Sequence, residues 1–233
     1  MADELSDFLA VREPTADHPL LGLTILLVED SRLACDAIRL LCQRSGARLR
    51  RADCLRSARR HLAAYRPSVV IVDLGLPDGS GLELIAELCE QRPRVGAILA
   101  TSGADALKDA AFAAGADGFL PKPIESLSAF RRAILDLLPG LPRPQPARAT
   151  AGGDLVHPDP LALRDDLSRA AELMDAGGAE RGYLAQFLTG VALGAHDAPL
   201  HRAAEALAQA PEAALLDRID GLVRARLATG GGL

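Results

Sequence analysis

Short apolar segments alternate with longer amphipathic stretches from residue 23 to about residue 138, and no other feature limits the possible folds so strongly. The candidate strands are residues 23–28, 48–52, 69–72, 95–100 and 118–120. The first, third and fourth are apolar throughout, which is typical of strands with both faces buried. The helical stretches lie near residues 33–44, 55–65, 81–91, 106–114 and 126–138. This alternation predicts an α/β fold with a doubly wound, five-stranded parallel sheet, because neighbouring parallel strands are joined through helices.

The rest of the chain has a different pattern. Residues 139–154, PGLPRPQPARATAGGD, are rich in Pro, Gly and Ala, which is typical of a linker. Helical patterns follow near residues 160–175, 180–194, 199–209 and 212–228, with apolar residues three or four positions apart. We therefore expect an N-terminal extension at 1–21, the α/β domain at 22–138, the linker at 139–154, and a small all-α helical bundle at 155–233.

Composition argues against several classes of function. The formal charge of −5 comes entirely from residues 151–233, which hold 12 acids and 7 bases, so DNA is an unlikely partner for the bundle. The cysteines occur singly, without the spacing of zinc sites, and we expect free thiols that are buried or half-buried. The chain has no apolar run of about 18 residues and its first residues are acidic, so we expect a cytoplasmic protein without a membrane partner.

Acidic side chains follow two of the predicted strands. Glu29 and Asp30 come directly after the first strand, and Asp73 comes directly after the third. The carboxyl ends of parallel strands meet at one edge of a sheet, where ligands bind, so we expect these carboxylates to lie together. Carboxylates held close repel one another unless a cation lies among them, and a small set of oxygen ligands suits Mg²⁺. The sequence predicts a magnesium site there.

Two further groups reach the same edge. The fourth strand runs into Thr101 and the fifth into Lys122, one of only two lysines in the chain. A carboxylate, a hydroxyl, an ammonium and a divalent cation together favour phosphoryl transfer onto the carboxylate. Taken singly, each of these residues has an ordinary alternative as a helix cap, a turn residue or a helix N-terminal charge.

Residues 22–138 resemble the receiver domain of two-component response regulators, which has a flavodoxin-like fold. The resemblance rests on the pair Glu29–Asp30, on Asp73 followed by LGLPDGSG, on Thr101, and on Lys122–Pro123, in the family's order. It implies that Asp73 accepts a phosphoryl group from a histidine kinase or a phosphotransfer protein, with Thr101 and Lys122 in the catalytic set.

The resemblance also implies a metal site and a switch. Asp30, Asp73 and the backbone carbonyl of Gly75 would hold Mg²⁺, with Glu29 in its outer shell. Thr101 and Phe119 match the hydroxyl and aromatic switch pair, and Phe119 lacks the hydroxyl of the commoner tyrosine. We expect no independent enzymatic turnover beyond phosphorylation and autodephosphorylation at Asp73.

The helical bundle faintly resembles histidine phosphotransfer domains, in which an Ala-His-x-Leu-Lys-Gly sequence exposes the phosphorylated histidine. One register places residues 204–209, AEALAQ, on that motif, with Glu205 where the histidine should be. The bundle would then be a degenerate relative that has lost the chemistry. His196 and His201 lie around a helix start, and the pattern assigns neither of them a role.

These patterns favour a response regulator whose phosphorylation controls a bundle for protein interaction or dimerisation. The main alternative is a phosphorelay intermediate in which the bundle is a working histidine phosphotransfer domain. A haloacid-type phosphatase or mutase would need a second acid where Gly75 stands. A transcription factor would need a basic recognition helix, which the acidic bundle does not predict.

Overall fold

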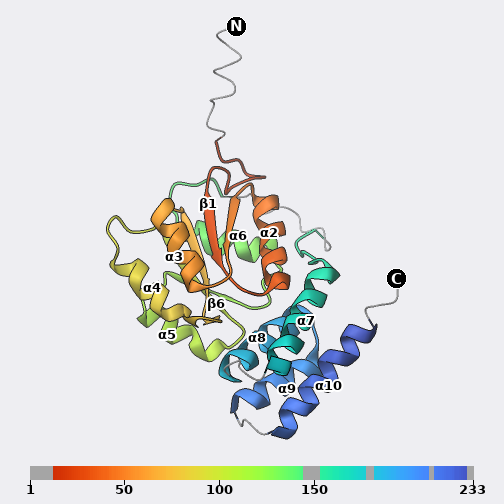
Figure 1. Ribbon diagram of the computed structural model, residues 1–233. Coiled ribbons are helices and arrows are strands. Elements are labelled where there is room, and N and C mark those ends of the chain that lie inside the picture. Colours follow the sequence, from red (N-terminus) through yellow and green to blue (C-terminus); the bar gives the residue numbers. More distant parts are fainter. Residues whose placement is uncertain (1–12, 144–152, 177–180, 210–212, 230–233) are drawn as a thin grey trace.

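The structure is a computed structural model that describes residues 13–143, 153–176, 181–209 and 213–229. An α/β domain and a helical bundle lie against each other (Figure 1). No helix in the described part of the chain is long and apolar enough to cross a membrane.

The sheet confirms the predicted fold class. Its strands are β1 (Thr24–Val28), β2 (Arg48–Ala52), β3 (Val69–Asp73), β6 (Ala97–Ser102) and β7 (Gly118–Pro121), in the order β2-β1-β3-β6-β7. All neighbours are parallel, and the order reverses between β1 and β3. Asp73 and Thr101, which we placed after their strands, are paired with each other inside β3 and β6.

Five helices cover the two faces of the sheet: α2 (Arg32–Ser45), α3 (Leu55–Ala64), α4 (Gly81–Glu90), α5 (Lys108–Ala113) and α6 (Leu127–Leu135). Ile25 and Leu27 pack on the face with α2 and α6, while Leu26 and Val28 pack on the face with α3, α4 and α5. Successive strand residues point to opposite faces, so a strand covered on both sides must be apolar throughout.

Two short features depart from the predicted pattern. The loop after β3 forms an antiparallel ribbon of β4 (Gly75–Leu76) and β5 (Gly79–Ser80), whose sequence has no strand-like alternation. The stretch predicted as one helix near residues 106–114 is a short 3₁₀ turn, η1 (Asp105–Leu107), followed by α5.

The second part consists of α7 (Pro160–Ala176), α8 (Arg181–Gly194), α9 (Ala198–Gln209) and α10 (Ala213–Thr229). Their apolar faces enclose a separate core that includes Leu167, Leu188, Leu200, Ile219 and Val223. This agrees with the helical spacing of the sequence and confirms an all-α region after the sheet.

The segments that flank the α/β domain are attached to it. Leu20, from the predicted extension, and Val156, from the predicted bundle region, are both buried in the core under α2 and α6. Most of the predicted linker, residues 144–152, lies outside the described residues. Its end is fixed by Asp154, whose carboxylate accepts hydrogen bonds from the Ser126 hydroxyl (2.6 Å) and the Ser128 amide (2.7 Å).

Candidate functional site

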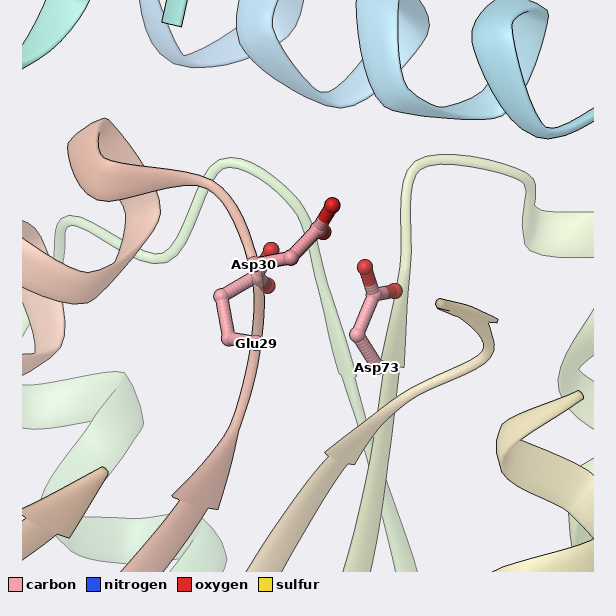
Figure 2. Close-up of side chains that lie close together, drawn as sticks. All are labelled: Glu29, Asp30 and Asp73. Atoms are coloured by element: carbon pink, nitrogen blue, oxygen red, sulfur yellow. The ribbon is translucent and has the colours of Figure 1, made fainter. Parts of the chain in front are cut away.

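The predicted acidic cluster lies at the carboxyl ends of β1 and β3, where the strand order reverses. Glu29, Asp30 and Asp73 are buried, and one carboxylate oxygen from each lies within 4.8 Å of the others. Figure 2 shows the three side chains gathered above the two strands. Open α/β sheets bind ligands at this switch point, and three carboxylates so close together suit a hard divalent cation. We call these residues the acidic site.

Lys122 enters the acidic site from the end of β7. Its Nζ lies 2.7 Å from Glu29 Oε2 and 3.0 Å from Asp73 Oδ2, and its side chain is only 7% exposed. Burial alone would lower the pKa of the ammonium, but Asp73 and Glu29 raise it well above its usual value. Lys122 therefore stays protonated and supplies one positive charge to the three acids.

One ammonium does not balance the acidic site. Burial and the neighbouring Glu29 raise the pKa of Asp73 to about 8, although Lys122 opposes this shift. Burial and Glu29 also raise the pKa of Asp30 to about 6. Removing charged carboxylates from water is costly without compensating charge, so the residues present fit a site that takes a further cation.

Thr101 brings a hydroxyl to the same place. It is paired with Asp73 across β3 and β6, and its Oγ1 is buried without a hydrogen-bond partner among the described residues. Buried hydroxyls are usually satisfied, so an unpaired one beside a carboxylate fits a site that receives another oxygen-rich group. Phe119 is half-buried in β7, where it is paired with Ala100, the neighbour of Thr101 in β6, and Gly75 opens the ribbon that follows Asp73.

Gly81 sets the position of the Asp73 backbone. A Cβ on Gly81 would overlap the carbonyl oxygen of Asp73, which cannot swing aside as a side chain can. We expect Gly81→Ala to lower the free energy of unfolding by about 1–3 kcal/mol in a denaturant titration. Gly221→Ala is the matched control, because a Cβ there meets nothing within 4 Å and alanine favours helix. Equal stability of the two variants would contradict this account.

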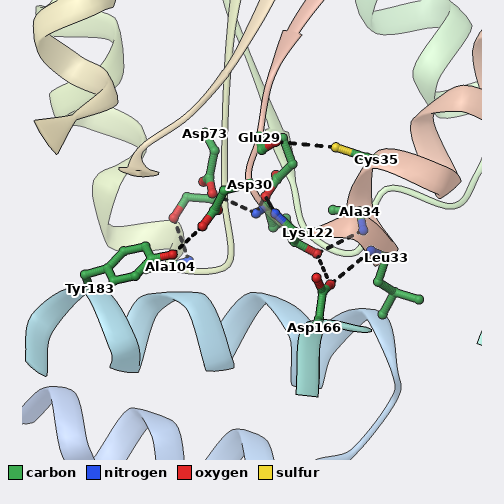
Figure 3. A network of polar contacts seen from close by, with 12 residues as sticks. Glu29, Asp30, Leu33, Ala34, Cys35, Asp73, Ala104, Lys122, Asp166 and Tyr183 are labelled. Carbon is green, nitrogen blue, oxygen red and sulfur yellow. Dashed lines mark hydrogen bonds and ion pairs between the residues drawn. The ribbon is translucent and has the colours of Figure 1, made fainter. Parts of the chain in front are cut away.

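The sequence did not predict the residues that the bundle contributes. Arg169 of α7 forms an ion pair with Asp30 (Nη2 to Oδ2, 3.1 Å), and the hydroxyl of Tyr183 of α8 donates a hydrogen bond to the same oxygen. Figure 3 shows Tyr183 reaching Asp30 from the bundle, while Asp166 lies beside Leu33 at the start of α2. The available signal in the sequence was the position of Asp166: it stands three positions after Leu163, on the apolar side of its helix, where an acidic side chain is expected to be buried.

Glu205, which we placed at the position of a phosphorylated histidine, is exposed on α9. His196, just before α9, pairs with Glu125 at 3.0 Å, and His201 lies 3.5 Å from Glu205. The Lys122–Pro123 peptide bond is cis. The cysteines are free, with Cys35 and Cys42 buried and Cys54 and Cys89 half-buried, as the sequence predicted.

Comparisons with known proteins bear on the α/β domain. The family model described as the response regulator receiver domain matches residues 25–134. KdpE, the KDP operon transcriptional regulatory protein of Escherichia coli, is 34% identical over 99 residues, which are 42% of this chain and 44% of that protein. The transcriptional regulatory protein BasR of the same species is 35% identical over 117 residues, 48% of this chain and 52% of the relative.

A third relative, the probable transcriptional regulatory protein TcrX of Mycobacterium tuberculosis, is 30% identical over 157 residues, 66% of this chain and 63% of its own. The chain spans about half the length of the curated relatives that it matches first. Because all three are named as transcriptional regulators, they give no support to the expectation that DNA is not a partner.

Solved structures with some likeness include a putative response regulator from Chloroflexus aurantiacus, with 25% identity and a TM-score of 0.46 over 49% of this chain and 96% of that one. Another is a response regulator from Burkholderia pseudomallei with a phosphorylated aspartic acid, calcium and citrate. It has 28% identity and a TM-score of 0.45, over 49% of this chain and 67% of its own. The family model and these curated relatives together identify residues 25–134, in the N-terminal part of the chain, as a response regulator receiver domain.

Proposed function

We propose that this chain is a phosphorylation-dependent switch in which Asp73 accepts a phosphoryl group, with Mg²⁺ bound, from a histidine kinase or a phosphotransfer protein. The observation that carries the proposal is the arrangement around Asp73: its carboxylate lies 3.0 Å from Lys122 Nζ and is paired in the sheet with Thr101, whose hydroxyl is buried and unpartnered among the described residues. This set offers a nucleophile, a cation and a free hydroxyl to one phosphoryl group.

Each residue has a defined task. An oxygen of Asp73 forms a bond to phosphorus as the bond to the donor's imidazole nitrogen breaks, and the imidazole leaves with the bonding electrons. Lys122 neutralises charge on the transferred oxygens, and Thr101 donates its hydroxyl to one of them. Asp30, Asp73 and the carbonyl of Gly75 would hold Mg²⁺, which supplies further charge neutralisation when bound, with Glu29 outside them. Thr101 and Phe119 would then transmit the conformational change that follows phosphorylation of Asp73.

The output that fits best is control of the helical bundle, as a protein-interaction or dimerisation region. The bundle contacts the acidic site directly through Arg169 and Tyr183, which bind Asp30, so phosphorylation at Asp73 would affect α7 and α8 through this contact as well as through Thr101 and Phe119. The alternative of a phosphorelay intermediate needs a histidine at this contact, and the bundle residues that touch Asp30 are an arginine and a tyrosine.

The test is intact mass after incubation with acetyl phosphate and Mg²⁺. We expect the wild type to gain one phosphoryl group and Asp73→Asn to gain none, since an amide is not a nucleophile at this site. Light scattering of both forms then reports dimerisation, and titration of duplex DNA at two salt concentrations reports nucleic-acid binding. A phosphoryl group gained by Asp73→Asn, or none gained either by the wild type or by Asp166→Ala, which removes a bundle contact with the receiver domain, would refute the proposal.

A further inference from the structure

The bundle inserts a buried carboxylate into the receiver domain. Asp166 of α7 is 1% exposed and accepts hydrogen bonds from the Ser31 hydroxyl (2.7 Å), the Arg32 amide (2.8 Å) and the Leu33 amide (3.0 Å). These donors form the N-terminus of α2, directly after Glu29 and Asp30. A helix N-terminus favours negative charge, and hydrogen bonds to a carboxylate are stronger than neutral ones. Asp166 therefore fastens α7 beside the acidic site.

A second set of contacts occupies Asp30. Arg169 Nη2 lies 3.1 Å from Asp30 Oδ2, and its Nη1 donates to the backbone oxygen of Asp30 at 3.1 Å. Tyr183 donates its hydroxyl hydrogen to Asp30 Oδ2 and accepts a hydrogen bond from Arg169 at 2.9 Å. One carboxylate oxygen of the proposed metal site thus faces two donors from the bundle, and a guanidinium places positive charge where the ion would place its own.

The backbone of α8 comes close to the loops around Asp73. A Cβ on Gly75 would lie 2.6 Å from Gln186 Oε1, and a Cβ on Gly103 would lie 2.8 Å from Leu193 Cδ1. On the bundle side, a Cβ on Gly190 would lie 3.4 Å from Lys122 Nζ. With α8 in this position the side chain of Asp73 is only 9% exposed. A phosphohistidine on another protein must reach this carboxylate, so the docked bundle stands in its path.

The sequence of α8 at this contact is informative. Residues 185–190 read AQFLTG, which matches the Ala-His-x-Leu-Lys-Gly motif of phosphotransfer domains at Ala185, Leu188 and Gly190. Gln186 stands at the position of the histidine, and it is the residue packed against Gly75. This register fits the contacts better than residues 204–209. A carboxamide does not accept a phosphoryl group from Asp73, so docking here occurs without transfer.

We propose that the face formed by Asp166, Arg169, Tyr183 and Gln186 is a receiver-docking surface that caps the acidic site of its own chain, and that it competes with Mg²⁺ and with phosphoryl donors for that site. We call these residues the cap. Loading of the metal at Asp30 displaces Arg169 and Tyr183 from the carboxylate. The bundle face that is released is then free for another partner, whose contact with the bundle is coupled to the state of Asp73.

The sharpest test uses Asp166→Ala, because two effects on Mg²⁺ affinity have opposite signs. Loss of an acid near the metal weakens Mg²⁺ binding by direct electrostatics, whereas loss of the cap strengthens it. We expect calorimetric titration to show about tenfold tighter Mg²⁺ binding by Asp166→Ala than by the wild type. Asp165→Ala is the matched control: Asp165 is the exposed neighbour of Asp166 on α7, and its exposed ion pair with Arg32 (3.0 Å) contributes little, so its loss should leave Mg²⁺ affinity nearly unchanged.

A second readout does not depend on substitution at α7. Addition of Mg²⁺ to the wild type should increase hydrogen exchange at the Arg32 and Leu33 amides, which donate to Asp166 in the docked form. Tyr183→Phe, which removes only the hydroxyl at Asp30, should shift Mg²⁺ affinity in the same direction as Asp166→Ala by a smaller factor. If Asp166→Ala fails to fold, the Mg²⁺ affinity of Tyr183→Phe tests the proposal in its place.

The cap is wrong if Asp166→Ala or Tyr183→Phe binds Mg²⁺ no more tightly than the wild type, or if Mg²⁺ leaves exchange at these amides unchanged or slower. The inference rests on the proposed metal site but not on phosphorylation. Absence of phosphoryl uptake in every form, with Mg²⁺ affinity raised in the variants, would refute the proposed function and leave the cap standing. Normal phosphoryl uptake, with equal Mg²⁺ affinities in the wild type and the variants, would refute the cap and leave the proposed function standing.

Discussion

Replacement of Lys122 by methionine is expected to lower the free energy of unfolding by about 3–5 kcal/mol near pH 9.5, because it leaves Glu29 and Asp73 buried without their cation. The loss should shrink as the pH falls towards about 7, because the folded pKa of Asp73 lies near 8 in the wild type and higher in the variant. Asp73 has a pKa raised to about 8 in the folded chain, far above its unfolded value, and removal of Lys122 raises it further. A group with a raised folded pKa binds its proton more tightly in the native state, so its protonation stabilises the variant at low pH.

Denaturant titrations of both forms at the two pH values measure this effect. Lys108→Met is the matched control, since Lys108 is the other lysine of the chain and is exposed at the start of α5. We expect it to change the free energy of unfolding by less than about 0.5 kcal/mol at either pH. A loss in Lys122→Met that is the same at both pH values would mean that packing of the lysine stem, and not its charge, stabilises the acidic site.

Phe130→Ala is expected to lower the free energy of unfolding of the receiver domain by about 3–5 kcal/mol. Phe130 is among the largest completely buried side chains and projects from α6 into the core shared with Leu20, Ile134 and Val156. Its truncation removes apolar contacts and leaves a cavity that the surrounding elements fill only in part. Because Leu20 and Val156 belong to the flanking segments, both segments should also become more susceptible to proteolysis.

The control for this substitution is Phe112→Ala on α5. Phe112 is 42% exposed, so its truncation should cost less than about 1 kcal/mol in the same denaturant titration. Similar losses for the two variants would contradict the assignment of Phe130 to the centre of the core.

The features that the sequence predicts well are those decided within a short stretch of chain. Residues 69–72 are apolar because both faces of β3 are covered, and Asp73 ends that strand, so the strand and the position of its acid follow from one pattern. Parallel topology then brings Glu29, Asp73, Thr101 and Lys122 together without further information. The ribbon of β4 and β5 was not predicted, because strands of two residues are too short to show an alternation of apolar and polar side chains.

The contacts between the two parts of the chain could not be predicted in the same way. The sequence around Tyr183 and Arg169 is that of ordinary helices. It gives no indication that both residues contact Asp30, which lies more than 130 positions earlier in the chain. Asp165 and Asp166 are adjacent acids with opposite environments, one exposed and one buried. Only the position of Asp166 on the apolar side of α7 distinguishes them, and that position identifies burial but not the surface that covers it.

Asp154, held at the start of α6, gives the cap a property that a separate protein would not have. The chain remains attached to the receiver domain up to Val156, which is buried in the receiver core, and α7 begins at Pro160, so only residues 157–159 connect the two parts. So short a tether keeps the bundle at an effective concentration of the order of millimolar. Dilution then does not open the site, and a partner free in solution competes with the cap only if its affinity exceeds what this proximity supplies.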